Sequence, residues 1–205
     1  PSGSEMMAFA EQLADDPAGL KREAQAMVEN AIRRAEVWRE HRERRGLGLD
    51  GFALCADYCF NVGPFMSPRH FEEFVTPYLA RLTKAYRDMG YYVIKHTDGN
   101  IMPIIDQLVS TNPHALHSLD PQAGVDIAVV KRLYGDRLCL IGNVNCAMLD
   151  TGTPEQIEES VCYALRNGMP GGGYIFSTSN CIYTGMPLTS YELMLDVWRR
   201  EGSYT

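Results

Sequence analysis

The chain has 205 residues with a formal net charge of -7 at pH 7; 45% of them are hydrophobic and 22% are charged. These values are ordinary for a globular protein with a real core, and, apart from Arg42, Arg44 and Arg45, nothing is basic enough for a nucleic-acid surface. Because no apolar run approaches the roughly 18 residues of a membrane span and no signal segment opens the chain, we expect neither nucleic acid nor a membrane as a partner.

The cysteines are scattered along the chain, and several lie inside apolar runs. Small secreted domains that are dense in cysteine use them as a disulfide framework, whereas scattered cysteines within apolar runs are typical of a reducing compartment. We therefore expect free thiols and a cytoplasmic protein. The cysteines are Cys55, Cys59, Cys139, Cys146, Cys162 and Cys181.

Residues 1–48 are expected to form two leading helices, over 4–15 and about 20–45. In the second, apolar residues recur at steps of three and four, and the opposite side carries Lys, Arg and Glu. Pro17 separates the two helices, because the residue before a proline avoids the helical region. This pattern indicates scaffold helices with one solvated face.

From residue 50 onward, short apolar runs alternate with amphipathic segments five times. Such runs are typical of parallel strands that are covered on both faces, and the alternation predicts an α/β protein built from βα units. Ser67-Pro68 and Thr153-Pro154 are expected to start helices, with Ser or Thr as N-cap and Pro in the first turn. Strands are expected over 50–57, 91–96, 114–120, 137–143 and 174–177, and helices over 67–89, 101–109, 127–134, about a dozen residues from 153, and 189–200.

Five βα units leave two architectures open. A (β/α)8 barrel has eight such units and typically needs about 250 residues, so this chain would be the C-terminal portion of a barrel. The alternative is an open, doubly wound sheet. The sequence shows no linker-like or low-complexity segment, and we expect a single domain over 1–205.

Polar residues follow each expected strand at the point where the strand ends. The densest group is His96-Thr-Asp-Gly-Asn100. Because the carboxyl ends of parallel strands meet at one edge of a sheet, one pocket is expected to collect these side chains. A histidine and a carboxylate two residues apart can bind a metal or exchange a proton with a substrate; alternatively, Asp98 caps the next helix. The group comprises Asp57, His96, Asp98, Asp120, Asn143, Asn145, Cys146, Ser179, Asn180 and Cys181.

A zinc site is one reading of this pocket. His96 and Asp98, with Cys146 and Cys181, would supply N, O and S ligands of the kind that zinc accepts. An open coordination position would let zinc hold a substrate thiolate or polarise an ether or hydroxyl oxygen. The cysteines do not show C-x-x-C spacing.

Several phrases of the sequence resemble the uroporphyrinogen decarboxylase superfamily, over about residues 50–205. The resemblance implies a (β/α)8 barrel with its site in the cleft at the carboxyl ends of the strands, and makes the five strands the last five of eight. The phrases are Gly-Pro-Phe-Met-Ser-Pro at 63–68, His-Thr-Asp-Gly-Asn at 96–100, Tyr-Gly-Asp-Arg-Leu-Cys-Leu-Ile-Gly-Asn at 134–143, Gly-Thr-Pro-Glu-Gln at 152–156 and Gly-Gly-Gly-Tyr-Ile at 171–175.

The superfamily holds two chemistries. Its decarboxylases use no cofactor and grip an acidic tetrapyrrole with an arginine-rich N-terminal segment, which the 205 residues do not include, and an aspartate. Its cobalamin-dependent methyltransferases pass a methyl group to a corrinoid protein or a thiol, and those that bind zinc use a His-x-Cys pair and a later Cys. Here His96 matches the histidine, Asp98 stands at the first cysteine, and Asn180 stands at the later one, with Cys181 one place on.

The resemblance implies a methyltransferase that moves a methyl group from a small methylated substrate to a corrinoid, carried by a partner protein, or to a thiol. The alternatives are a uroporphyrinogen decarboxylase without a cofactor and a non-catalytic barrel fragment. A homodimer or an N-terminal segment is expected to complete the barrel. The expected catalytic residues are His96, Asp98, Asp57 and Asn180; the substrate-binding residues are Asn100, Asp120, Asn143, Asn145 and Ser179; and the zinc ligands are His96, Asp98, Cys146 and Cys181.

Overall fold

The computed structural model describes residues 6–48 and 50–204. Two helices lead the chain, α1 (Met6–Asp15) and α2 (Pro17–Arg44). The second begins three residues earlier than the apolar pattern predicts, because Asp16 caps it by accepting a hydrogen bond from the Gly19 amide at 2.8 Å. The start of the expected first helix, at residues 4 and 5, lies outside the described residues.

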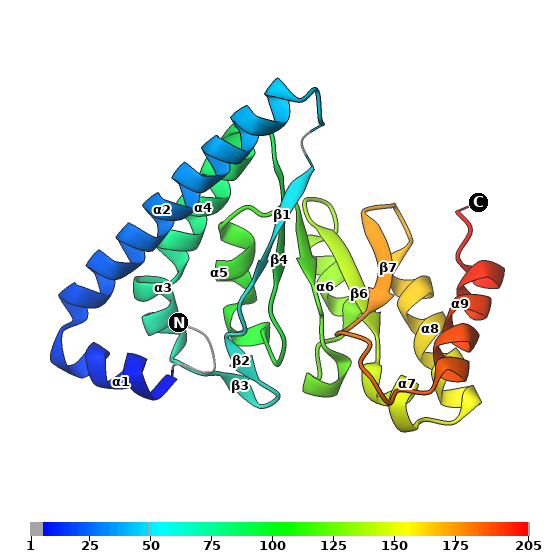
Figure 1. Cartoon of the computed structure of the whole chain (residues 1–205). Helices are drawn as coiled ribbons and strands as arrows, with labels where there is room; N and C mark the ends of the chain where they lie inside the picture. Colours follow the sequence, from blue (N-terminus) through cyan, green and yellow to red (C-terminus); the bar gives the residue numbers. More distant parts are fainter. Residues whose placement is uncertain (1–5, 49, 205) are drawn as a thin grey trace.

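Five strands form one parallel sheet whose spatial order, β1-β4-β5-β6-β7, is also their order along the chain. A doubly wound sheet reverses direction at a switch point, whereas the units of a barrel continue in one direction. The doubly wound alternative is therefore wrong, and the expectation of a barrel portion is confirmed (Figure 1). The strands are β1 (Gly51–Cys55), β4 (Tyr92–His96), β5 (Ala115–His117), β6 (Cys139–Val144) and β7 (Tyr174–Thr178).

The remaining elements connect these strands. A short antiparallel hairpin, β2 (Cys59–Phe60) and β3 (Gly63–Pro64), lies between the expected strand over 50–57 and the helix expected from 67. The helices are α3 (Pro68–Phe74), α4 (Thr76–Asp88), α5 (Ile105–Ser110), α6 (Ile127–Tyr134), α7 (Cys146–Thr151), α8 (Pro154–Gly168) and α9 (Leu188–Glu201), with 3-10 turns η2 (Met102–Ile104) and η3 (Pro121–Ala123).

Two expected helices differ from the structure. The segment 67–89 is two helices, separated at Val75, whose φ is -123°. Pro77 lacks the N–H that would bond to the Glu73 carbonyl, and its ring would clash there, so a continuous helix breaks. The expected helix over 101–109 begins with the 3-10 turn η2, which has Pro103 in its first turn, and continues as α5.

The two faces of the sheet have different surroundings. One row of side chains in register packs into the core with the helices: Leu54, Lys95, Leu116, Leu140 and Tyr174. The next row faces the other side: Cys55, His96, His117, Ile141 and Ile175. Within 6–48 and 50–204 this second face is not fully covered, because Cys55 is exposed and Ile175 is 51% exposed. The expectation that both faces are covered is wrong for these residues, since in a barrel the inner face packs against other strands.

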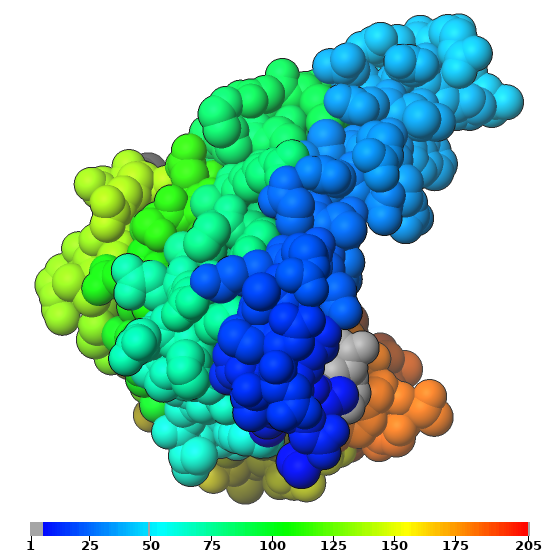
Figure 2. Space-filling model, turned by 90° about the vertical axis from the view of Figure 1, so that its left-hand side faces the viewer, coloured from blue at the N-terminus to red at the C-terminus, as the bar shows by residue number. Residues whose placement is uncertain are grey.

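The leading helices lie outside the sheet. In Figure 1, α2 runs alongside α3 and α4, and in Figure 2 the light-blue end of α2 projects beyond the green helices. Among the helices of the described residues, none is both long enough and apolar enough to cross a membrane.

Candidate functional site

Asp57, His96 and Asp98 meet at the carboxyl ends of β1 and β4. Cys55 pairs with His96 in the parallel register, so each carboxylate comes two residues after a paired position. One ligand atom of each residue lies within 4.8 Å of the other two. His96 Nε2 is 3.8 Å from Asp57 Oδ1 and 3.7 Å from Asp98 Oδ1. The Asp98 backbone N–H also donates to Asp57 Oδ1 at 3.0 Å, which ties the two strand ends together.

Two further strand ends hold the Asp98 carboxylate. Ser118, just after β5, donates its hydroxyl to Asp98 Oδ1 at 2.6 Å. Asn180, two residues after β7, donates its side-chain amide to Asp98 Oδ2. The structure therefore brings together all four residues expected to be catalytic, Asp57, His96, Asp98 and Asn180. Their catalytic role stays a prediction.

A second histidine, His117, contacts His96. The two Nδ1 atoms are 2.7 Å apart, and the ring centroids are 4.9 Å apart. His117 Nε2 lies 3.2 Å from the Thr178 carbonyl oxygen of β7. Burial, and then the neighbouring His96, lower the pKa of His117. The sequence signal for this residue was a histidine near the end of the third expected strand, but only the register places it beside His96.

Lys95 lies under the site, on the helix-facing side of the sheet, with 1% of its surface exposed. Its ammonium donates to the backbone carbonyls of Leu54 at 3.1 Å, Ala56 at 2.9 Å and His96, and it lies 4.4 Å from the centre of the Tyr58 ring. Burial lowers the pKa of this group to about 7. Lys95 thus fastens the ends of β1 and β4, the two strands that present the carboxylates. A lysine inside an apolar strand was the sequence signal for it.

The residues expected to bind substrate hold the surrounding loops. Asn100 accepts from the Met102 amide at 3.2 Å, and Asp120 and Asn145 cap η3 and α7. Burial raises the pKa of Asp120. Asn143 and Ser179 are buried; Asn143 donates to the Leu119 carbonyl at 2.9 Å, and the Ser179 hydroxyl oxygen lies 3.5 Å from the Cys146 amide. Whether any of these five also contacts a substrate stays a prediction.

The two expected thiol ligands lie differently. Cys146 is buried at the start of α7, where its Sγ lies 3.2 Å from the Asn180 amide and 3.4 Å from the Asn180 carbonyl. Cys181 is exposed. Within the described part of the chain, the grouped ligand atoms come from Asp57, His96 and Asp98, and neither thiol belongs to this group.

This donor set, one imidazole nitrogen and two carboxylate oxygens, fits a divalent cation. Zinc accepts nitrogen and oxygen ligands at about 2.0–2.2 Å, which places two tetrahedral ligands about 3.4 Å apart. The distances of 3.7 and 3.8 Å are a few tenths of an ångström wider. With oxygen in place of sulfur, the set also suits harder cations such as Mn²⁺.

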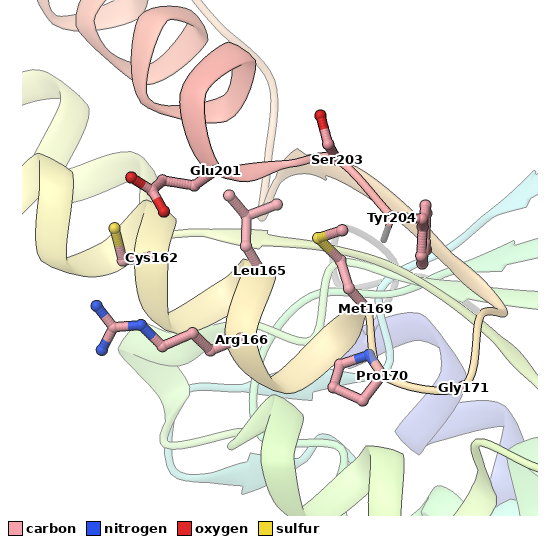
Figure 3. A pocket seen from close by; sticks show the side chains of 9 residues that line it. All are labelled: Cys162, Leu165, Arg166, Met169, Pro170, Gly171, Glu201, Ser203 and Tyr204. Atoms are coloured by element: carbon pink, nitrogen blue, oxygen red, sulfur yellow. The ribbon is translucent and has the colours of Figure 1, made fainter.

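A hollow of about 340 Å³ lies elsewhere, between the end of α8 and the segment that follows α9 (Figure 3). Leu165 of α8 and Met169, directly after α8, line it together with Tyr204. Pro170 and Gly171, also in its wall, precede β7, so the hollow is at the amino end of the strands. The Asp57–His96–Asp98 cluster is at the carboxyl end, and the hollow is separate from it.

The fold and the cluster together define a portion of a (β/α)8 barrel with a histidine and two carboxylates at the carboxyl ends of its strands. The family model "Uroporphyrinogen decarboxylase (URO-D)" matches residues 54–201. The chain belongs to the uroporphyrinogen decarboxylase family, and the resemblance seen in its sequence is confirmed.

Individual relatives are distant. A uroporphyrinogen decarboxylase of Pseudoalteromonas translucida is 28% identical over 130 residues, which are 58% of this chain and 34% of the relative. One of Psychromonas ingrahamii is 28% identical over 138 residues, 65% of this chain and 38% of the relative. The matches thus span about a third of the length of these relatives. Among solved structures, a methyltransferase from Methanosarcina mazei has the same fold, with a TM-score of 0.74 and 18% identity, over 96% of this chain and 54% of that one.

Proposed function

We propose that this protein is a methyltransferase that moves a methyl group from a small methylated substrate to a corrinoid or thiol acceptor. The observation that carries the proposal is the grouping of Asp57, His96 and Asp98 at the carboxyl ends of two barrel strands. Membership of the family and the shared fold with a protein named as a methyltransferase support it.

In this proposal Asp57, His96 and Asp98 hold a divalent cation such as Zn²⁺. When bound, the cation supplies a Lewis acid that polarises a substrate oxygen or favours the thiolate form of a thiol. Ser118 and Asn180 orient Asp98 by donating to its two oxygens, so the ligand keeps its geometry without substrate. The corrinoid, if it is the acceptor, would come with a partner protein that docks at the carboxyl end of the strands.

The test uses full-length protein, first analysed for bound metal. Methyl transfer to reduced cobalamin is then followed by its visible spectrum, with methylated thiols, methylamines and methoxylated aromatics as donors. We expect His96→Ala to lose the bound metal, because the substitution removes one of its ligands. The rate of methyl transfer should fall by at least about 100-fold. His41→Ala, on α2, is the matched histidine control and should keep both. If His96→Ala bound as much metal as the wild type, His96 would not be a metal ligand.

A second function is uroporphyrinogen decarboxylation, which the family match and the names of the curated relatives favour. It requires no cation, and Asp57, with a side chain 48% exposed, would be the carboxylate that meets the substrate. Incubation with uroporphyrinogen under reducing conditions should then release CO₂ in the presence of a chelator. Asp57→Asn would abolish the release of CO₂. In this case His96→Ala would not change the metal content, because no metal is bound.

If the full-length protein showed neither activity, the non-catalytic barrel would be the remaining reading.

We also propose a cytoplasmic location, because the cysteines at positions 55, 59, 139, 146, 162 and 181 are all free thiols.

A further inference from the structure

The histidine pair determines which nitrogen of His96 carries a proton. His117 Nε2 faces the Thr178 carbonyl oxygen at 3.2 Å. A carbonyl oxygen can only accept, so this contact is a hydrogen bond only when His117 Nε2 is protonated. In the neutral ring, His117 Nδ1 then has a lone pair and is an acceptor.

The partner of that lone pair is His96 Nδ1, at 2.7 Å. Two ring nitrogens this close need one proton between them, and His117 Nδ1 is the acceptor, so His96 Nδ1 is the donor. The proton between the two rings therefore lies on His96 Nδ1, and Asp57 and Asp98 lie 3.8 and 3.7 Å from the other ring nitrogen, Nε2.

The remaining nitrogen, His96 Nε2, therefore faces two carboxylate oxygens with its lone pair. This arrangement of a lone pair and two carboxylates is unfavourable when the site is empty, because the groups repel one another. It becomes favourable when a cation binds between them. The opposite tautomer would put a proton on Nε2, where a metal ion would have to bind.

We propose that His117 is a positioning residue that holds His96 protonated on Nδ1, so that Nε2 is free to bind a divalent cation with Asp57 and Asp98. The proposal rests on the cation site of the proposed function and does not depend on the methyl donor or acceptor.

The position of His117 lets it act on more than one strand end. Strand β6 lies between β5 and β7, yet the His117 ring reaches across it to the backbone of Thr178. Asn180, two residues further, donates to Asp98. His117 thus links the His96 ring to the end of β7, and Asn180 in the loop after β7 holds Asp98, a second expected ligand.

The chain offers a matched pair of variants at this position. In His117→Asn, the amide oxygen is as many bonds from Cα as the imidazole Nδ1, so it can accept from His96 Nδ1–H. His117→Leu has nearly the same shape as the asparagine but no acceptor. We expect the leucine variant to bind Zn²⁺ about 10- to 100-fold more weakly than wild type, and the asparagine variant to stay within about threefold.

Zn²⁺ affinity is measured on full-length protein by competition with a chromogenic chelator, with circular dichroism to check folding. The tautomer is read directly by long-range ¹⁵N–¹H correlation spectra of the histidine rings in metal-free wild type. Signals of His96 protonated on Nδ1 and His117 protonated on Nε2 are expected, and His96→Ala identifies the first set.

A metal-free His96 protonated on Nε2 would overturn the proposal, as would equal zinc affinity of the leucine and asparagine variants. The spectra do not require the leucine variant to fold. Failure of methyl transfer, with the tautomer and the affinity order as expected, would reject the proposed function and leave the role of His117 intact.

Discussion

Lys95 shows how one residue can support a site without facing it. Its ammonium bonds to carbonyls of both β1 and β4, and its side chain is surrounded by core residues. Removing this charged donor takes one hydrogen bond from each carbonyl, at about 1–3 kcal/mol each, although the His96 carbonyl still accepts from the Ala56 amide at 3.4 Å. The lysine therefore joins the strand ends that place Asp57 and His96, while the burial of its charge opposes folding.

We predict that Lys95→Met keeps at least the free energy of unfolding of wild type at pH 6, because methionine fills the space without a charge, and the ammonium that it replaces is disfavoured in the folded chain. Urea denaturation at pH 6 measures the difference. Lys84→Met is the control: Lys84 is 76% exposed and paired with Asp88 at 2.5 Å, and such surface pairs contribute less than about 1 kcal/mol. A loss in Lys95→Met well above that in Lys84→Met would contradict this prediction and show that the three hydrogen bonds of Lys95 outweigh the burial of its charge.

The same lysine predicts a pH dependence. Burial lowers its pKa to about 7, while the unfolded chain keeps the ordinary value near 10.5. Between these values the unfolded chain binds more protons, so the free energy of unfolding should rise with pH, by about 1.5 kcal/mol from pH 7 to 8.5. Above that range Cys59 opposes the rise, because burial raises its thiol pKa to about 12. Denaturation with reductant at several pH values measures the slope, which Lys95→Met should lack.

The sequence predicted which side chains lie at the ends of the strands better than it predicted which side chains contact one another. His96, Asp98, Asp57 and Asn180 could be placed at strand ends from the alternation alone. His117 and Lys95 could not, because their roles depend on the register between strands and on which face of the strand they occupy. Cys146 and Cys181 were expected in the metal site because they follow strands, but neither thiol belongs to the ligand group. A loop position near the pocket does not determine where a short side chain points.

The elements illustrate how local signals set helix boundaries. Where a cap and a proline stand together, as at Thr153-Pro154, the predicted start agrees with the structure. Where an apolar pattern runs through a proline, as at Pro77, the helix breaks. Helix α7 was not predicted, because six residues are too short for a helical period to appear in the sequence.

Helix α8 should depend measurably on its capping box. The Thr153 hydroxyl accepts from the Gln156 amide, and the Gln156 side chain accepts from the Thr153 amide at 2.8 Å. We predict that Thr153→Ala costs about 1 kcal/mol of unfolding free energy, and that Thr153→Ser costs only a few tenths. Thermal unfolding of the pair measures this. Equal melting temperatures of the two variants would show that the box does not stabilise α8, which packs against β6 and β7.

Among the described residues, one face of the sheet is not fully covered by helices. Along this face His96 and His117 lie in register with Ile141 and Ile175. A barrel closes this face by curving the sheet on itself, and the outer edges of β1 and β7 would pair with further strands. Either additional polypeptide or a second copy of the chain could supply them.

Ile175 tests whether this face is closed in the full-length protein. It is 51% exposed in the described residues but sits in the row that a complete barrel would bury. We predict that Ile175→Lys lowers the free energy of unfolding by about 2–5 kcal/mol, because a lysine there would be buried without a partner. Val62→Lys, at a position 90% exposed in the turn between β2 and β3, is the control and should be neutral. Denaturation and sedimentation velocity of both variants measure stability and association. A neutral Ile175→Lys would mean that the face stays open to water, and the barrel would then be incomplete in the working protein.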